Sequence, residues 1–271
     1  MKSMKRRKFM ISGMLAASGA AAGTLTPTAA RAMFQPGREY FHKMANFDLA
    51  HESDVVTPNE ELPVLETTLA RIKRVQATVG YGNFNVLGFD DMLKIAKNYP
   101  SVEGFAAAEL RFIERLFHAD AALYGFHGTK VLPNISDDID VKRTVSVRGT
   151  GQRIYRGPAL AKYRCLKRAI GDDLVLTSGV RSVVKQLYLF MNKAARSHGN
   201  LSLASRSLAP PGYSFHAIGD FDVGKRGFGR ANFTAAFADT DVYKRLVDLG
   251  FADIRYPEHN LLGVRFEPWH V

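Results

Sequence analysis

Two short segments of the sequence carry the residues best suited to chemistry. The first contains His216, Asp220 and Asp222, and the second, near the end of the chain, contains Glu267 and His270. Two imidazoles and one carboxylate are a typical ligand set of catalytic zinc, which keeps a fourth position open for water. A further carboxylate can accept the proton of that water. The sequence therefore predicts a catalytic metal centre, provided that the fold brings the two segments together.

The composition is that of a globular protein. Of the 271 residues, 46% are hydrophobic and 23% are charged. The net charge is +11, but residues 1–32 hold six basic residues and no acidic one, and only +5 remains beyond them. We therefore expect no nucleic-acid partner. Cys165 is the single cysteine, which excludes a disulfide framework and a cysteine-rich structural zinc site.

The N-terminus has the pattern of an export signal. Arg6 and Arg7 precede an apolar run rich in alanine and glycine, and a small-residue cleavage site ends at Ala32. The paired arginines favour twin-arginine export, with a Sec signal as the alternative. Residues 1–32 are therefore predicted to be a signal peptide. The rest of the chain has no apolar run long enough to span a membrane, which predicts an exported protein in the periplasm or cell-wall space.

The first part beyond the signal has helical periodicity. Apolar residues at spacings of three and four predict a helix from residue 61 to the glycines after residue 79. Similar patterns predict helices at residues 89–97 and 102–124. We therefore expect a helical N-terminal lobe over residues 33–130, with its apolar stripes forming a core.

Residues 131–271 alternate less regularly between short strands and helices, which favours an α+β fold with a small antiparallel sheet and flanking helices. The predicted strands are 144–147, 174–179, 217–223, 254–256 and 264–266, and the predicted helices are 159–170, 183–198 and 241–249.

Four sequence pieces in this second part carry a resemblance to a known family. They are, in order, Thr177-Ser178-Gly179-Val180-Arg181-Ser182 with Gln186, then Gly212-Tyr213-Ser214-Phe215-His216 with Gly219, then Gly250-Phe251 with Arg255-Tyr256-Pro257, and Glu267-Pro268-Trp269-His270. With them, residues 155–271 resemble the zinc D-alanyl-D-alanine carboxypeptidases of the VanY type, in the LAS group of metallopeptidases. That group also contains the hedgehog signalling domain. The resemblance implies the same kind of α+β fold around a zinc site.

The resemblance also implies roles for individual residues. His216, an aspartate soon after it, and His270 would bind Zn²⁺, and Glu267 would be the general base that activates zinc-bound water. Arg181 would polarise the scissile carbonyl. Substrate-binding roles fall to Ser214, Gln186 and Tyr213. Glu267 and His270 are three residues apart, so a turn at Pro268 is needed to direct both side chains at one metal.

The third ligand departs from the family pattern, which has aspartate seven residues after the histidine. Val223 occupies that position here. In a strand, Asp220 and Asp222 would point to the same face, because side chains alternate with a period of two. A deletion of one residue after Gly219 restores the family's order, so we favour Asp222 and keep Asp220 as the alternative.

The resemblance predicts a zinc metallopeptidase that hydrolyses D-Ala-D-Ala or related amide bonds in peptidoglycan stem peptides. Two alternatives are a peptidoglycan cross-link endopeptidase and a non-catalytic, zinc-containing module that binds the cell wall. Glu267 argues against the last one, because a binding module has no need of a general base.

Overall fold

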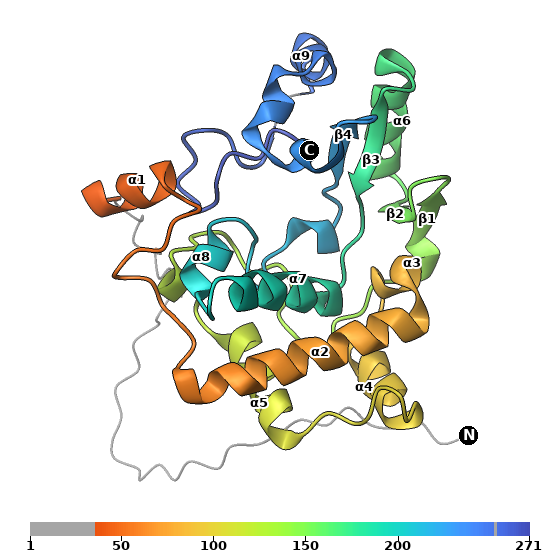
Figure 1. The fold of residues 1–271 in the computed structure, drawn as a ribbon. Coiled ribbons are helices and arrows are strands. Elements are labelled where there is room, and N and C mark those ends of the chain that lie inside the picture. Colours follow the sequence, from red (N-terminus) through yellow and green to blue (C-terminus); the bar gives the residue numbers. More distant parts are fainter. Residues whose placement is uncertain (1–35, 252–253) are drawn as a thin grey trace, which may run out of the picture. The chain divides into compact units, whose positions relative to one another are not determined.

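The computed structural model describes residues 36–251 and 254–271 (Figure 1). The described residues belong to one compact unit. The predicted signal peptide, residues 1–32, lies outside the described residues. No helix within the described part is long and apolar enough to cross a membrane.

The N-terminal part is helical, as its periodicity predicts. Pro63 lies in the first turn of α2, where its missing N–H costs nothing, and Gly80 ends the helix with a φ of 82°. Glu109 of α5 accepts a hydrogen bond from the backbone N–H of Ala106. It also forms an ion pair with Arg71 of α2, and this pair links the two helices. The α-helices of this part are α1 (Arg38–Ala45), α2 (Leu62–Val79), α3 (Tyr81–Phe84), α4 (Phe89–Asn98) and α5 (Ala107–His118).

The single helix predicted for residues 102–124 is wrong. The chain forms α5 and then a separate 3₁₀ helix at Ala121–Tyr124. Glu103 adopts a φ of 66° before α5, and Ala119 is not helical after it. Asp120 then caps the second helix by accepting a hydrogen bond from the N–H of Ala122. The spacing of apolar residues alone does not reveal these breaks in the helix.

The second part contains two small antiparallel sheets in the described residues, where the sequence predicted one. Strands β1 (Thr144–Val147) and β2 (Gln152–Tyr155) form a hairpin, and β3 (Leu174–Ser178) pairs with β4 (Asp222–Lys225). The helices are α6 (Pro158–Ile170), α7 (Val183–Arg196), α8 (Leu201–Ser205) and α9 (Asp241–Asp248).

Three other strand predictions need correction. The strand predicted at residues 217–223 begins only at Asp222, because a 3₁₀ helix at Phe215–Ala217 reverses the chain first. Neither 254–256 nor 264–266 is a strand. Their backbone groups bond to loops instead; for example, the N–H of Arg265 donates to the carbonyl of Arg206 at 2.9 Å.

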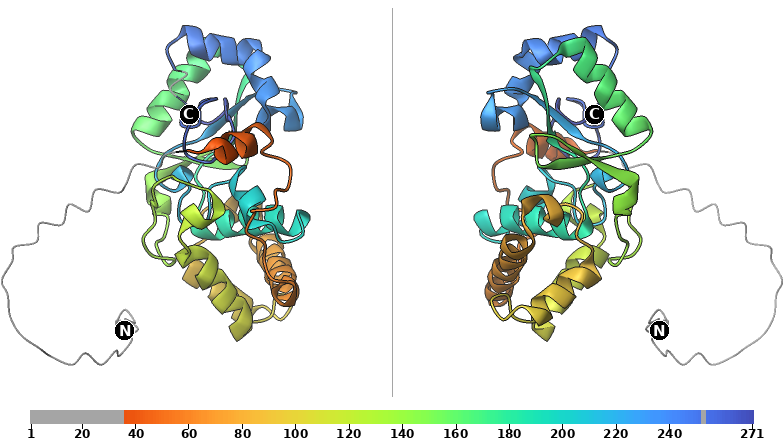
Figure 2. Two further views of the ribbon diagram at one scale, coloured as in Figure 1. Left: turned by 90° about the vertical axis from the view of Figure 1, so that its left-hand side faces the viewer. Right: turned by 90° about the vertical axis from the view of Figure 1, so that its right-hand side faces the viewer.

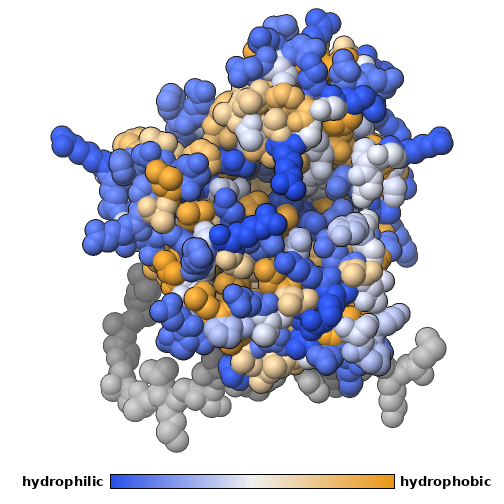
Figure 3. All heavy atoms as spheres, in the orientation of Figure 1, coloured by the Kyte–Doolittle hydropathy of each residue, from blue (hydrophilic) through white to orange (hydrophobic). Residues whose placement is uncertain are grey.

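Two main hydrophobic cores lie on either side of the segments that carry the predicted site. One joins α2, α4 and α5 to α7 and α8, and the other joins α6, β3, β4 and α9 to the C-terminal residues Trp269 and Val271. Figure 1 shows α7 between the sheet-bearing part and α2, and the side views of Figure 2 agree. Hydrophilic residues predominate on the face in Figure 3, with hydrophobic residues in small groups among them. The strand β3 leads directly through Arg181 to the start of α7, so the site residues lie where the two cores meet.

Candidate metal centre and catalytic site

Backbone pairing brings the two candidate segments together. His216 lies in the 3₁₀ helix that precedes β4, and Asp222 is the first residue of β4. The C-terminal residues run antiparallel to this segment, with an isolated bridge between Asp222 and His270. A turn through Pro268 follows Glu267, and the N–H of His270 donates to the carbonyl of Glu267 at 3.1 Å. The predicted turn is therefore confirmed.

Three buried side chains converge at this point. Asp222 Oδ1 lies 3.3 Å from His216 Nε2 and 3.5 Å from His270 Nδ1. One ligand atom from each residue lies within 4.8 Å of the others. Separations near 3.3 Å are expected between ligand atoms that surround a zinc ion at about 2.0–2.2 Å. The geometry therefore brings together the favoured set, His216, Asp222 and His270.

The two imidazoles are oriented by hydrogen bonds on their outer nitrogens. His216 Nδ1 lies 2.8 Å from the carbonyl oxygen of Gly179, and His270 Nε2 lies 3.0 Å from Asp220 Oδ2. When each of these nitrogens donates its proton, the lone pairs of His216 Nε2 and His270 Nδ1 face Asp222. Such outer partners fix the tautomer of metal-binding histidines.

Gly179 is required where it is. A Cβ atom at this position would lie 1.9 Å from the carbonyl oxygen of Arg153, a contact that real structures do not tolerate. The same close approach lets the N–H of Val180 donate to Arg153 at 2.7 Å. The glycine therefore allows β2 to fix the turn whose carbonyl holds His216.

Asp220, the alternative ligand, contacts Arg255 and the outer nitrogen of His270. Its carboxylate forms an ion pair with Arg255, with Oδ1 3.1 Å from Arg255 Nη2, and its other oxygen faces His270. The guanidinium of Arg255 lies 3.5 Å from the ring centroid of Phe215. Burial raises the pKa of Asp220, but the bonds to His270 and Arg255 outweigh it and hold the pKa below its usual range. Asp220 is thus an anionic support for His270.

The electrostatics of the centre favour a cation. Burial lowers the pKa of His216, and the positive charge of Arg181 adds to this effect. Burial also lowers the pKa of His270, but hydrogen bonds to Asp220 and Glu267 outweigh it and raise the pKa to about 9. Asp222 Oδ1 is buried without a hydrogen-bond partner. An orphaned carboxylate oxygen between two imidazole nitrogens fits a metal ion, because a buried anion otherwise needs a paired charge.

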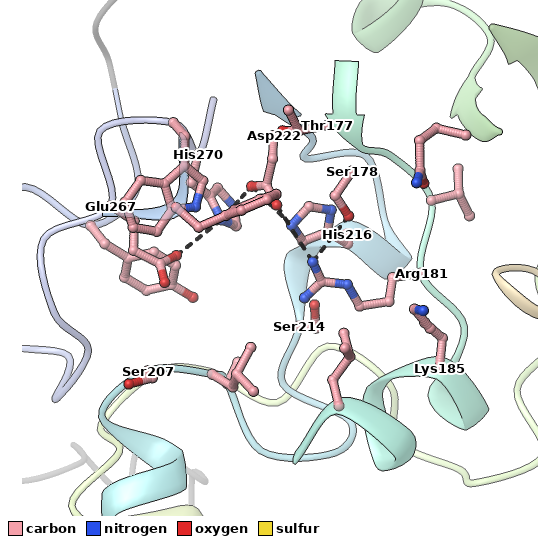
Figure 4. Close-up of a pocket in the computed structure, with 18 of the residues that line it drawn as sticks. Thr177, Ser178, Arg181, Lys185, Ser207, Ser214, His216, Asp222, Glu267 and His270 are labelled. Carbon is pink, nitrogen blue, oxygen red and sulfur yellow. Dashed lines mark hydrogen bonds and ion pairs between the residues drawn. The ribbon is translucent and has the colours of Figure 1, made fainter. Parts of the chain in front are cut away.

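Arg181 and Glu267 lie on different sides of this cluster (Figure 4). Glu267 Oε2 is 3.5 Å from His270 Nδ1, and Arg181 Nη2 is 3.5 Å from Asp222 Oδ2. Arg181 also donates to Ser178 Oγ and to Gln186 Oε1, each at 3.1 Å. These bonds hold the guanidinium in place before any ligand arrives.

A cavity of about 350 Å³ opens onto the cluster. Most of the predicted site residues line it: Arg181, Ser214, His216, Asp222, Glu267 and His270. Gln186 and Tyr213 are not among the lining residues. Gln186 contacts the site through Arg181, and the ring of Tyr213 packs on Phe126 in a separate apolar cluster.

Three further residues of the cavity wall, Tyr256, Lys185 and Arg265, were not predicted to have a role. Tyr256 is buried, and its ring centroid lies 5.1 Å from that of His270. Burial raises the pKa of Tyr256, and the negative charge of the nearby Glu267 raises it further. Lys185 and Arg265 also line the cavity. Tyr256 belongs to the Arg255-Tyr256-Pro257 piece of the resemblance, so the sequence did indicate that it lies near the site. Lys185 and Arg265 had no such indication, because a single cation between apolar residues looks like any solvated side chain.

A buried pair of histidines with an aspartate is a donor set that could hold a divalent metal ion, and a glutamate and an arginine lie beside it. Residues 158–271, from the first residue of α6 to the last residue of the sequence, match the model of the family described as VanY, D-alanyl-D-alanine carboxypeptidase. A comparison with curated protein sequences found no match.

Solved structures with similarity to this chain include the following three. The vancomycin-resistance D,D-pentapeptidase VanY, in complex with Zn(II), is 27% identical over 47% of this chain and 75% of its own, with a TM-score of 0.36. The LD-carboxypeptidase LdcB is 28% identical over 44% of this chain and 57% of its own, with a TM-score of 0.36. VanYB in complex with D-alanine-D-alanine is 27% identical over 51% of this chain and 79% of its own, with a TM-score of 0.38.

Proposed function

We propose that the protein is a zinc-dependent peptidase that hydrolyses the D-Ala-D-Ala amide bond of peptidoglycan stem peptides. The observation that carries the proposal is the convergence of His216, Asp222 and His270 beside Glu267 on one cavity. The match of residues 158–271 to the D-alanyl-D-alanine carboxypeptidase family supports it independently of that geometry. The substrate lies outside the cytoplasmic membrane, which agrees with the proposed export signal in residues 1–32.

In this proposal His216, Asp222 and His270 hold the metal. A zinc ion bound there would supply Lewis-acid chemistry toward a water molecule and the scissile carbonyl. Glu267, beside His270, accepts the proton of the attacking water and returns it to the leaving nitrogen. Arg181 donates hydrogen bonds toward the carbonyl oxygen as negative charge develops on it, where a preorganised cation lowers the barrier most.

The surroundings keep these groups in position. Gln186 and Ser178 orient the Arg181 guanidinium. Ser214, which is 5% exposed and lines the cavity, is placed to hydrogen-bond the peptide backbone. Tyr213 supports the loop of His216 through its packing on Phe126. We therefore propose contact with substrate for Ser214 and positioning roles for Gln186 and Tyr213.

The test measures metal content and hydrolysis separately. The purified protein is expected to contain one equivalent of zinc and to release D-alanine from a stem pentapeptide. Glu267→Gln should keep the zinc and lower kcat by about 10²- to 10⁴-fold, the usual contribution of a general base. Asp239→Asn, at an exposed position, is the control. Zinc binding without hydrolysis of any muropeptide would favour the non-catalytic wall-binding alternative, and cleavage of cross-linked dimers without release of terminal D-alanine would favour the endopeptidase.

A further inference from the structure

The hairpin and α6 carry a concentration of positive charge that the chemistry above does not use. Residues 141–171 contain nine basic residues and no acidic one, whereas the whole chain beyond residue 32 has a net charge of only +5. Acidic residues therefore outnumber basic ones in the rest of that chain. The segment includes β1, β2 and α6, and α6 packs against β2 (Figure 1). The positive charge is thus gathered on one part of the fold.

A second cavity, of about 630 Å³, is lined by three of these cations, Arg143, Arg156 and Lys162. The two arginines are exposed and the lysine is half-buried. The backbone joins the arginines, because the N–H of Arg156 donates to the carbonyl of Arg143 at 2.8 Å. Arg156 Nε also donates to the carbonyl of Lys142 at 3.2 Å. Cations that line one concave surface add their fields and attract an anion.

The start of α6 adds to this field. Pro158 and Ala159, its first two residues, line the second cavity. The preceding Gly157 provides no side-chain cap, and the first turn has no acidic residue. The N–H groups at the start of a helix and the helix dipole favour an anion. The helix end and the three cations therefore act in the same direction.

The acidic side chain that lines the second cavity is Asp220, and its oxygens already have partners. One oxygen bonds to Arg255 Nη2 and the other to His270 Nε2. At Tyr155, in the cavity wall, the charge of Arg143 lowers the pKa by more than the charge of Asp140 raises it. The positive charge of the second cavity is therefore not cancelled by nearby carboxylates.

The opposite wall connects the second cavity with the metal centre. Residues 217–221 line the second cavity, whereas the flanking His216 and Asp222 line the catalytic one. Tyr155 of β2 donates from its hydroxyl to the carbonyl of Ala217 at 2.7 Å, which fixes the hairpin to this short segment. The two cavities therefore lie against the same stretch of chain, so a polymer bound at the metal centre has further parts within reach of the second cavity.

We propose that the second cavity binds a free carboxylate of a neighbouring peptidoglycan stem and holds the polymer while another stem occupies the catalytic cavity. This inference rests on the proposed function, which supplies the polymer. The forked guanidinium groups of Arg143 and Arg156 match a carboxylate. An anionic lipid surface is less suited, because binding to a membrane surface needs an apolar face. Among the described residues that line the cavity, Ile218 is the exposed large apolar side chain.

The experiment measures co-sedimentation with purified peptidoglycan sacculi in a Glu267→Gln background, which leaves the polymer intact. Combining Arg143→Gln, Arg156→Gln and Lys162→Gln should weaken binding about 3- to 100-fold at low salt, the range for three exposed charge pairs. Binding by the parent should weaken as salt is added. Lys162→Glu alone should show a loss of the same kind, and circular dichroism establishes that each variant is folded.

The matched control removes three exposed cations from the N-terminal helices and should bind like the parent. Its substitutions are Lys73→Gln, Lys97→Gln and Arg111→Gln. Sacculi whose carboxylates have been converted to methylamides should bind the parent as weakly as untreated sacculi bind the combined variant.

Three results would overturn the assignment: an equal loss in the control variant, equal binding of treated and untreated sacculi, or binding of phosphatidylglycerol vesicles in preference to sacculi through the same three cations. Hydrolysis of a soluble stem pentapeptide by the wild type tests the proposed function separately. If that hydrolysis is absent, the proposed function fails. The second cavity keeps its assignment in that case if binding to sacculi depends on the three cations and on free carboxylates.

Discussion

Asp220 and Asp222 allow a direct comparison between an inner and an outer carboxylate of the proposed metal centre. Asp222 Oδ1 faces both imidazoles at 3.3 and 3.5 Å, whereas Asp220 contacts one imidazole, at the outer nitrogen of His270, and pairs with Arg255. Replacing each aspartate with asparagine preserves the shape and removes the charge. We expect Asp222→Asn to weaken zinc binding far more than Asp220→Asn does.

The structure sets the size of each effect. Asp222 is 3% exposed, and removal of one partner from a buried charge pair costs about 3–5 kcal/mol. This corresponds to a loss of zinc affinity of roughly 200- to 5000-fold. Asp220 acts through a histidine, and the loss of such an outer partner lowers affinity by about 10- to 100-fold. The ion pair of Asp220 with Arg255 would also be lost, so its effect should be at the upper end of that range.

Zinc affinity is measured by competition with a chromophoric chelator at neutral pH, with Asp239→Asn as control. Circular dichroism and urea unfolding of each variant establish that the fold is intact. The reasoning would be refuted if Asp220→Asn abolished zinc binding while Asp222→Asn kept it within tenfold of the wild type. That result would make Asp220 the ligand, as the alternative reading of the sequence allows.

Two further predictions concern stability. Burial, with the charge of Arg181 adding to it, lowers the pKa of Lys185 to about 8. Between about pH 8 and 10.5 the unfolded chain therefore holds a proton on this lysine that the folded protein lacks. The free energy of unfolding of the wild type consequently increases as the pH rises through that window. Lys185→Met should therefore stabilise the protein by about 1–2 kcal/mol at pH 7, after allowance for partial solvent exposure, and the gain should vanish near pH 10.5 in urea unfolding; an equal effect from the exposed Lys97→Met would contradict this explanation. Gly179→Ala should lower the free energy of unfolding by more than about 2 kcal/mol, because its Cβ would overlap the Arg153 carbonyl, and a variant as stable as the wild type would show that this contact relaxes freely.

The convergence of the residues of the centre was predictable because their order and chemical types match the pieces of the resemblance. His216, Asp222, Glu267 and His270 could be named before their positions were known, and the turn at Pro268 followed from the need to aim two side chains at one ion. The outer residues were not predictable in the same way. Asp220 looked like a competing ligand, since strand alternation would place it on the same face as Asp222. Both carboxylates do face His270, but Asp220 meets its Nε2 and Asp222 its Nδ1, which also lies near His216.

The errors in the fold have a common physical origin. Local patterns report which residues are apolar, but not which backbone groups find partners far along the chain. The apolar run at residues 102–124 suggested one helix, and the break after His118 depends on the cap that Asp120 provides. The predicted strand at residues 264–266 has strand-like residues, but Arg265 bonds to the end of α8 instead of a sheet.

The position of α7 has a consequence for the autonomy of the family-matched segment. Val184, Leu187 and Met191 on this helix are fully buried, and α7 packs against α2 and α4 from the N-terminal part. Exposure of such side chains costs about 1.5–3 kcal/mol each. Residues 131–271 expressed alone would therefore expose an apolar surface that favours aggregation. Arg181, just before α7, would then be held less firmly in place. The N-terminal helices cover the apolar face of α7, and the two parts are expected to unfold together in one transition.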